Sequence, residues 1–246
     1  MKTAGIIGGL GPESTIEYYH QIIALFLAQS PERNYPSFII NSINLKKVID
    51  LITASKFADL TNYLLAEINR LANAGANFAA VSANTPHVVF DELRSRSPIP
   101  LISIVEATCK RAQEMGLKRV GLFGTRFTMQ GQFYPKVFGQ AKIELAVPTL
   151  DEQNYIHRKY MDELVNGIFL SDTHDEFLRI AECMRSEERI EGLILGGTEL
   201  PLLLKQAPNH DLPFLDTTKI HVESIVQEML SDLPSSTDLR APRATG

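Results

Sequence analysis

Short runs of apolar residues alternate along the chain with longer stretches in which apolar residues recur at helical spacing. The short runs predict buried strands at Ala4–Ile7, Ser37–Ile43, Phe78–Val81, Leu101–Ile104, Arg119–Phe123, Glu144–Val147, Gly192–Leu195 and Phe214–Leu215. The longer stretches predict helices at Thr15–Ala28, Ala58–Ala74, Pro86–Ser95, Val105–Met115, Met129–Phe138, Glu152–Gly167, Thr173–Arg185, Leu200–Lys205 and Thr217–Ser231, the last capped by Thr217 or Thr218. This alternation of strands and helices is typical of α/β proteins with parallel sheets.

The two halves of the chain show the same order of features. The GIIGG segment at Gly5–Gly9 resembles GLFGT at Gly121–Thr125, and VSANT at Val81–Thr85 resembles LGGT at 195–198. Each segment is an apolar run that ends in a turn of small residues. The two turns are almost equally far apart in both halves, which predicts two similar α/β units. The alternative is that buried parallel strands generally end in small residues.

The predicted elements suggest how the chain is divided. We expect a first α/β domain over 1–103 together with 212–232, a second over 104–211, and a disordered tail at 233–246. No apolar run is long enough to span a membrane, and glycines interrupt the N-terminal apolar run before it could form a signal peptide. We therefore expect a cytoplasmic protein with no membrane partner.

Composition narrows the possible functions. The 246 residues carry a formal net charge of −5 without a basic stripe, so we expect no nucleic-acid partner. Two cysteines, Cys109 and Cys183, are too few for a disulfide scaffold or a cysteine-rich zinc site, and both lie in predicted helices. The six histidines lack metal-ligand spacing, so we expect no metal.

Four loops follow predicted strands and are candidates for a binding site. In open α/β sheets, ligands bind beyond the carboxyl ends of the strands. The loops are Gly8–Pro12, Ser82–His87, Gly124–Thr128 and Gly196–Glu199. They offer glycines, free backbone N–H groups and the neutral side chains of Asn84, Thr85, Thr125, Thr128 and Thr198, a combination that favours a small carboxylate. The same residues are also common helix caps and turn formers.

The first of these loops does not match a nucleotide-binding motif. Gly8–Gly11 is followed by Pro12, so the third glycine of G-x-G-x-x-G is missing. No Lys-Ser or Lys-Thr pair follows the glycines, as a phosphate-binding Walker loop would require. We therefore expect neither a dinucleotide nor a nucleoside triphosphate as ligand.

Four segments together resemble the aspartate/glutamate racemase family. They are GIIGGLGPEST at the start, ANTPHVVFDEL at Ala83–Leu93, VGLFGTRFTM at Val120–Met129 and LILGGTELPLLLKQ at Leu193–Gln206, and the resemblance spans residues 1–232. It implies two flavodoxin-like domains related by a pseudo-twofold axis, a ligand cleft between them, an isomerase without cofactor, and a homodimer. In that family two cysteines flank the α-carbon of the substrate, and thiols suit both proton removal and proton delivery.

This sequence departs from the family motif at both cysteine positions. The matching residues are Ala83 and Gly197, and neither side chain can carry a proton. The resemblance implies a role in binding an amino acid or carboxylate for Gly9, Lys47, Ser82, Ala83, Asn84, Thr85, Thr125, Thr128, Gly197 and Thr198. Lys46 or Lys47 could hold a distal carboxylate, whereas residues 161–166 offer no basic side chain.

Three hypotheses about function follow from these departures. In the first, the protein is an enzyme in which Glu199 or His87 replaces the thiols, because both groups titrate in a useful range. Each could instead have a packing or hydrogen-bonding role. In the second, it is a binding protein or pseudoenzyme that no longer racemises. In the third, the two positions have been substituted artificially to trap a complex.

Overall fold

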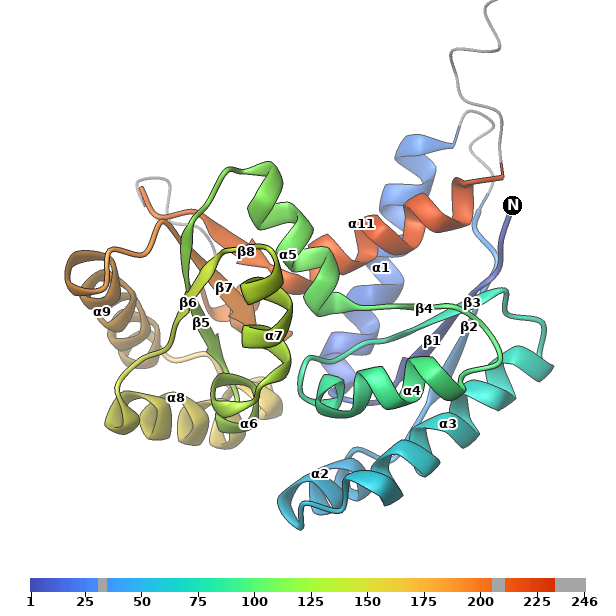
Figure 1. Ribbon diagram of the computed structural model, residues 1–246, viewed down its shortest axis with the longest axis horizontal. Coiled ribbons are helices and arrows are strands. Elements are labelled where there is room, and N and C mark those ends of the chain that lie inside the picture. Colours follow the sequence, from blue (N-terminus) through green and yellow to red (C-terminus); the bar gives the residue numbers. More distant parts are fainter. Residues whose placement is uncertain (31–34, 205–210, 233–246) are drawn as a thin grey trace, which may run out of the picture.

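The computed structural model describes residues 1–30, 35–204 and 211–232. Within these ranges the chain forms two parallel four-stranded sheets that stand side by side (Figure 1). The strands are β1 (Ala4–Gly8), β2 (Phe38–Ser42), β3 (Phe78–Val81), β4 (Leu101–Ile102), β5 (Arg119–Gly124), β6 (Glu144–Ala146), β7 (Gly192–Gly196) and β8 (Phe214–Asp216). The predicted α/β class with two parallel sheets is therefore confirmed.

The second sheet repeats the first strand for strand. The first has the order β2-β1-β3-β4 and the second the order β6-β5-β7-β8. Each half therefore places its first and third strands at the centre, and these central strands are buried along their whole length except at Arg119, the partly buried first residue of β5. This arrangement matches the similarity between the GIIGG and GLFGT segments.

Helices cover the faces of both sheets. They are α1 (Pro12–Gln29), α2 (Leu45–Thr53), α3 (Phe57–Asn73), α4 (Phe90–Arg96), α5 (Ile104–Glu114), α6 (Arg126–Gln130), α7 (Phe133–Gln140), α8 (Leu150–Asp162), α9 (Ser171–Glu187), α10 (Leu200–Leu203) and α11 (Thr217–Leu230), with 3₁₀ turns η1 (Thr85–Val89) and η2 (Leu164–Asn166). The last helix, α11, packs against both α1 and α5 and so connects the two sheet layers (Figure 1). The predicted division of the chain into domains stays a prediction.

Two predicted elements need correction. The predicted helix at Met129–Phe138 is two helices, α6 and α7, that meet at Gly131. A Cβ at Gly131 would lie 2.7 Å from the carbonyl oxygen of Phe127, so the chain can turn there only without a side chain. The predicted helix at Glu152–Gly167 ends at Asp162 and is followed by η2. The predicted end of the Leu200–Lys205 helix lies outside the described residues.

Two further corrections concern α2 and α11. Helix α2 was not predicted, although Asn44 caps it by accepting a hydrogen bond from the backbone N–H of Lys47. Helix α11 was expected to begin at a threonine cap. Instead, the Asp216 carboxylate accepts hydrogen bonds from the backbone N–H groups of Thr218, at 2.9 Å, and Lys219, at 3.1 Å. A carboxylate at this position also interacts favourably with the helix dipole.

Two buried histidines link elements of the core. His221 on α11 donates from Nε2 to the Ile102 carbonyl at 3.1 Å, and its Nδ1 accepts from the Tyr18 hydroxyl at 2.7 Å. His87 donates from Nδ1 to the Ala83 carbonyl at 3.0 Å and accepts at Nε2 from the Ile104 N–H at 3.3 Å. Burial lowers the pKa of His87 to about 3 and that of His221 to about 4. Both rings are therefore neutral near pH 7.

This burial predicts that the protein loses stability in mild acid. Below the ordinary histidine pKa of about 6.5 the unfolded chain takes up protons, whereas the folded chain does not until the pH is near 4. The stabilisation is complete above about pH 6.5. It falls as the pH decreases, by up to about 1.4 kcal/mol per pH unit for each histidine.

Urea unfolding of a His221→Gln variant tests this expectation. The slope of the unfolding free energy against pH, between pH 6.5 and 4.5, should be shallower than in the unmodified protein, whatever happens to absolute stability. His20→Gln, on the exposed face of α1, is the matched control. An unchanged slope in His221→Gln would mean that the proton uptake occurs elsewhere.

Candidate functional site

The four loops at the carboxyl ends of β1, β3, β5 and β7 meet at one cavity of about 200 Å³. Drug-sized ligands occupy cavities of roughly 300–1,000 Å³, so this one suits a smaller molecule. Helices α2 and α8 and the η2 turn complete its wall. The cavity is therefore built from both halves of the chain.

Hydroxyl groups from the two halves meet at this cavity. The Thr85 hydroxyl lies 3.1 Å from that of Thr125 and 3.2 Å from that of Thr128. Thr125 and Thr128 are 3.2 Å apart, and Thr125 also caps α6. Thr85 and Thr125 line the cavity, whereas Thr128 is fully buried behind them. The cluster supplies neutral donors at the boundary between the halves.

The Asn84 side chain is held by two partners at the cavity wall. Its amide oxygen accepts from the Tyr134 hydroxyl at 2.7 Å, and its amide nitrogen donates to the Thr217 hydroxyl at 3.1 Å. Thr217 in turn donates to the Leu195 carbonyl at 2.8 Å. One amide hydrogen of Asn84 therefore remains available as a donor, in a fixed orientation.

Tyr160 on α8 fills the space beside Gly197. A Cβ added at Gly197 would lie 2.5 Å from Cε2 and 2.8 Å from the hydroxyl oxygen of Tyr160. The Tyr160 hydroxyl donates a hydrogen bond to Oε2 of Glu199. The Thr198 hydroxyl donates to the same oxygen at 2.9 Å. Gly197 thus lies in contact with Tyr160, whose hydroxyl is paired with the Glu199 carboxyl.

Glu199 is a buried carboxyl at the cavity wall, with only 3% of its surface exposed. Burial raises its pKa above the ordinary value, although the hydrogen bonds from Tyr160 and Thr198 oppose the shift. Its second oxygen, Oε1, points toward Gly11, where an added Cβ would lie 2.6 Å away. Gly11 has φ +121°, a conformation that favours glycine, and it begins α1 in the first half. The carboxyl thus reaches from one half to the other.

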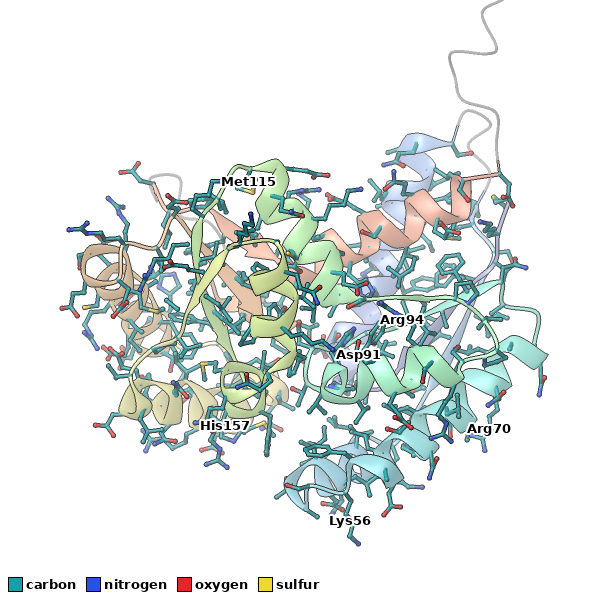
Figure 2. All side chains as sticks on the ribbon, in the orientation of Figure 1. Lys56, Arg70, Asp91, Arg94, Met115 and His157 are labelled. Atoms are coloured by element: carbon teal, nitrogen blue, oxygen red, sulfur yellow. The ribbon has the colours of Figure 1, made fainter. Side chains whose placement is uncertain are left out.

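Titratable side chains on the cavity wall come from only one half. Among the described lining residues they are Arg126, His157, Tyr160 and Glu199. His157 projects from α8 (Figure 2), and burial lowers its pKa. Its Nδ1 accepts from the backbone N–H of Arg126 at 3.3 Å. The wall from the first half, by contrast, has only apolar, glycine, amide and hydroxyl side chains.

The structure brings together some of the predicted site residues. Those that line the cavity are Ala83, Asn84, Thr85, Thr125, Gly197, Thr198 and Glu199. Gly9, Lys47, Ser82, His87 and Thr128 do not line it. Ser82 is fully buried and donates to the Ile7 carbonyl at 2.8 Å, and the Lys47 ammonium lies 3.9 Å from the centre of the Tyr63 ring. Both ring nitrogens of His87 are already engaged with the backbone.

Sequence reasoning missed helix α2 altogether, and it did not assign any residue of the predicted Glu152–Gly167 helix to the site. Helix α2 contributes Leu45, Val48, Ile49, Ile52 and Thr53, and the α8–η2 segment contributes His157, Tyr160, Met161 and Val165. The spacing of the apolar residues in α2 was a usable signal. No comparable sequence signal marks Tyr160 as a site residue, because an aromatic residue among the regularly spaced apolar residues of a helix is usually part of a core. Neither Cys109 nor Cys183 lines the cavity.

Two kinds of feature are absent from residues 1–30, 35–204 and 211–232. No helix there is long and apolar enough to cross a membrane. No group of three or more histidine, cysteine, aspartate or glutamate side chains in the same ranges could hold a metal ion.

Comparisons with known proteins agree on one family. The family model described as Asp/Glu/hydantoin racemase matches residues 7–225. The broad specificity amino-acid racemase RacX of Bacillus subtilis is 22% identical over 236 residues, which make up 92% of this chain and 98% of that protein. The solved structure of an aspartate racemase homologue from Pyrococcus horikoshii OT3 is 33% identical with a TM-score of 0.81, covering 93% of this chain and 99% of that one. A provisionally assigned Asp/Glu racemase from Yersinia pestis is 30% identical with a TM-score of 0.86, covering 94% and 100%.

Proposed function

Because the chain belongs to the Asp/Glu/hydantoin racemase family, we propose that it binds an amino acid or another small carboxylate in the cavity between its two sheets. The carboxylate would lie at the hydroxyl cluster, where Thr85 and Thr125 from opposite halves are 3.1 Å apart. Asn84 adds a fixed amide donor from the same wall. The similarity to a broad specificity amino-acid racemase supports an amino acid as the ligand.

We do not expect the reaction to use the pair of thiols that is typical of the family. The sequence resemblance matches the family cysteines with Ala83 and Gly197. We propose instead that Glu199 transfers the proton at the α-carbon, with Tyr160 holding its carboxyl in place. The observation that carries this proposal is a buried Glu199 at the cavity wall, with a raised pKa. A raised pKa brings a carboxyl closer to the range in which it serves as a general base or acid near neutral pH.

Proton transfer from Glu199 would occur on one face of the substrate only. All titratable lining residues in the described ranges come from the second half, and the first half presents the Ala83 methyl group instead. A single base removes a proton and returns one to the same face. We therefore expect solvent hydrogen to enter the α-position of one enantiomer with its configuration retained. Incubation in D₂O followed by NMR tests for this exchange.

A binding protein without catalytic activity is the second candidate. Two observations favour it: the Tyr160 ring fills the space beside Gly197, and no titratable side chain among the described lining residues comes from the first half. Such a protein would keep the carboxylate-binding cluster. It would bind amino acids tightly but would transfer no deuterium to them. The enzyme would bind them and would also exchange their α-hydrogen for deuterium.

Thr85→Val is expected to weaken ligand binding by about tenfold or more. The substitution keeps the shape of the side chain but removes a donor to the carboxylate, and a hydrogen bond to a charged group contributes roughly 1.5–3 kcal/mol. Calorimetric titration with the amino acid that binds best measures the loss. Thr53→Val, at the α2 end of the same cavity, makes the same chemical change away from the cluster. Equal losses in the two variants would place the carboxylate elsewhere.

A further inference from the structure

The part of the cavity wall that α2 of the first half and the α8–η2 segment of the second supply is mostly apolar. Besides Thr53, His157 and Tyr160, six apolar side chains line it. We call these residues the α2–α8 subsite: Leu45, Val48, Ile49, Ile52, Met161 and Val165. Val48 and Ile52 are almost fully buried, and the other four are partly exposed.

The cations of α2 do not serve this subsite. Lys46 is exposed and forms an ion pair with Asp50 at 2.6 Å on the same helix. The Lys47 ammonium lies 3.9 Å from the centre of the Tyr63 ring. Neither lysine lines the cavity. No lining residue from the described part of the first half therefore offers a positive charge to a ligand in the subsite.

Among the described residues of the second half, one permanently charged cation lines the cavity. Arg126 lines the cavity but is exposed, and its guanidinium lies 5.7 Å from the centre of the Phe127 ring. Burial lowers the pKa of His157, which disfavours a charge on its ring. A carboxylate placed among the six apolar side chains would lose its water without gaining a positively charged partner, which is costly. Apolar groups gain free energy in the same place.

We propose that the ligand is an amino acid with an extended aliphatic side chain, and that this side chain occupies the α2–α8 subsite. The inference rests on the proposed function, since the carboxylate must first lie at the Thr85–Thr125 cluster. The subsite and the cluster belong to the same cavity, so one small molecule can fill both. Leucine, methionine and norleucine have suitable side chains, whereas aspartate and glutamate do not.

A homologous series measures the subsite directly. Calorimetric titration with alanine, 2-aminobutyrate, norvaline and norleucine should show affinity rising about fourfold per added methylene, the equivalent of ~0.8 kcal/mol. Glutamate should bind at least about tenfold more weakly than norleucine, which corresponds to a difference in binding free energy of about 1.4 kcal/mol. A flat series, or tighter binding of aspartate or glutamate, overturns the inference but leaves the proposed function standing. If none of these amino acids binds, the proposed function itself fails.

A variant pair locates the effect on α2. Ile49→Arg places a cation in the subsite and should move the preference toward glutamate by about tenfold or more. Ala54→Arg adds the same charge at the exposed end of α2, outside the cavity, and should leave the preference unchanged. Ile49→Ala should weaken norleucine binding but not alanine binding, which provides a second readout if Ile49→Arg does not fold. An Ile49→Ala variant that weakens both ligands equally would contradict the assignment.

Discussion

Glu199→Gln is expected to reduce exchange of the substrate α-hydrogen with solvent by about 10²–10⁴-fold, the usual contribution of general acid–base catalysis. The amide has nearly the same shape and can still accept a hydrogen bond from Tyr160 or Thr198, but it cannot take up a proton. Ligand affinity should change little, because in our proposal the carboxylate of the ligand binds at the threonine cluster and not at Glu199. The rate of deuterium incorporation from D₂O, followed by NMR, measures the loss.

Two companion variants separate proton transfer from general electrostatics. Glu13→Gln neutralises a nearby carboxylate that helps to raise the pKa of Glu199, without touching the cavity wall. It should retain most of the exchange activity. Tyr160→Phe removes a hydrogen bond that lowers the pKa of Glu199. The acidic limb of the pH–rate profile should therefore move to higher pH. If all three variants lose exchange equally with unchanged pH profiles, Glu199 is not the proton-transfer group.

Gly197→Ala should damage both stability and exchange, although it adds only one methyl group. The new Cβ would lie 2.5 Å from Cε2 of Tyr160, whose side chain is only 6% exposed and is hydrogen-bonded to Glu199. Overpacking of a core position typically costs about 1–3 kcal/mol. Displacement of Tyr160 would also disturb the Glu199 carboxyl. Urea unfolding and deuterium exchange measure the two effects.

A double-mutant cycle identifies Tyr160 as the cause. In a Tyr160→Ala background the space is open, so Gly197→Ala should cost little further stability. Gly139→Ala on α7 is the matched control, because a Cβ there meets nothing within 4 Å. If the losses in unfolding free energy of the two single variants simply add in the double variant, the strain at Gly197 does not come from Tyr160. The same overlap means that cysteines placed at 83 and 197 should not restore two-thiol chemistry while Tyr160 is present.

The repeated fold was readable from the sequence because it depends on local patterns. Buried parallel strands such as β1 and β5 are short apolar runs that end in glycines, and these survive in both halves. Helix α2 was missed because its nine residues include two lysines between apolar positions. The break at Gly131 was missed because it depends on contacts with Phe127 and Phe133 that form only in the folded chain.

The candidate site was only partly predictable for a similar physical reason. Residues on strand-end loops, such as Thr85 and Glu199, could be placed because parallel topology brings those ends together. Tyr160 reaches the cavity from a helix far along the chain, and only packing places its hydroxyl at Glu199. His87 lies on a predicted loop, yet its ring turns away from the cavity to bind backbone groups. The domain boundaries, the homodimer and the cytoplasmic location stay predictions.

The most direct test of this account is solvent exchange at the α-carbon without thiols. The unmodified protein would be incubated in D₂O with the separate L- and D-enantiomers of norleucine, aspartate and glutamate, and each product analysed by NMR and chiral chromatography. We predict deuterium at the α-position of one enantiomer of norleucine, with its configuration retained. Binding without deuterium in any substrate, or a racemic labelled product, would contradict one-sided proton transfer by Glu199.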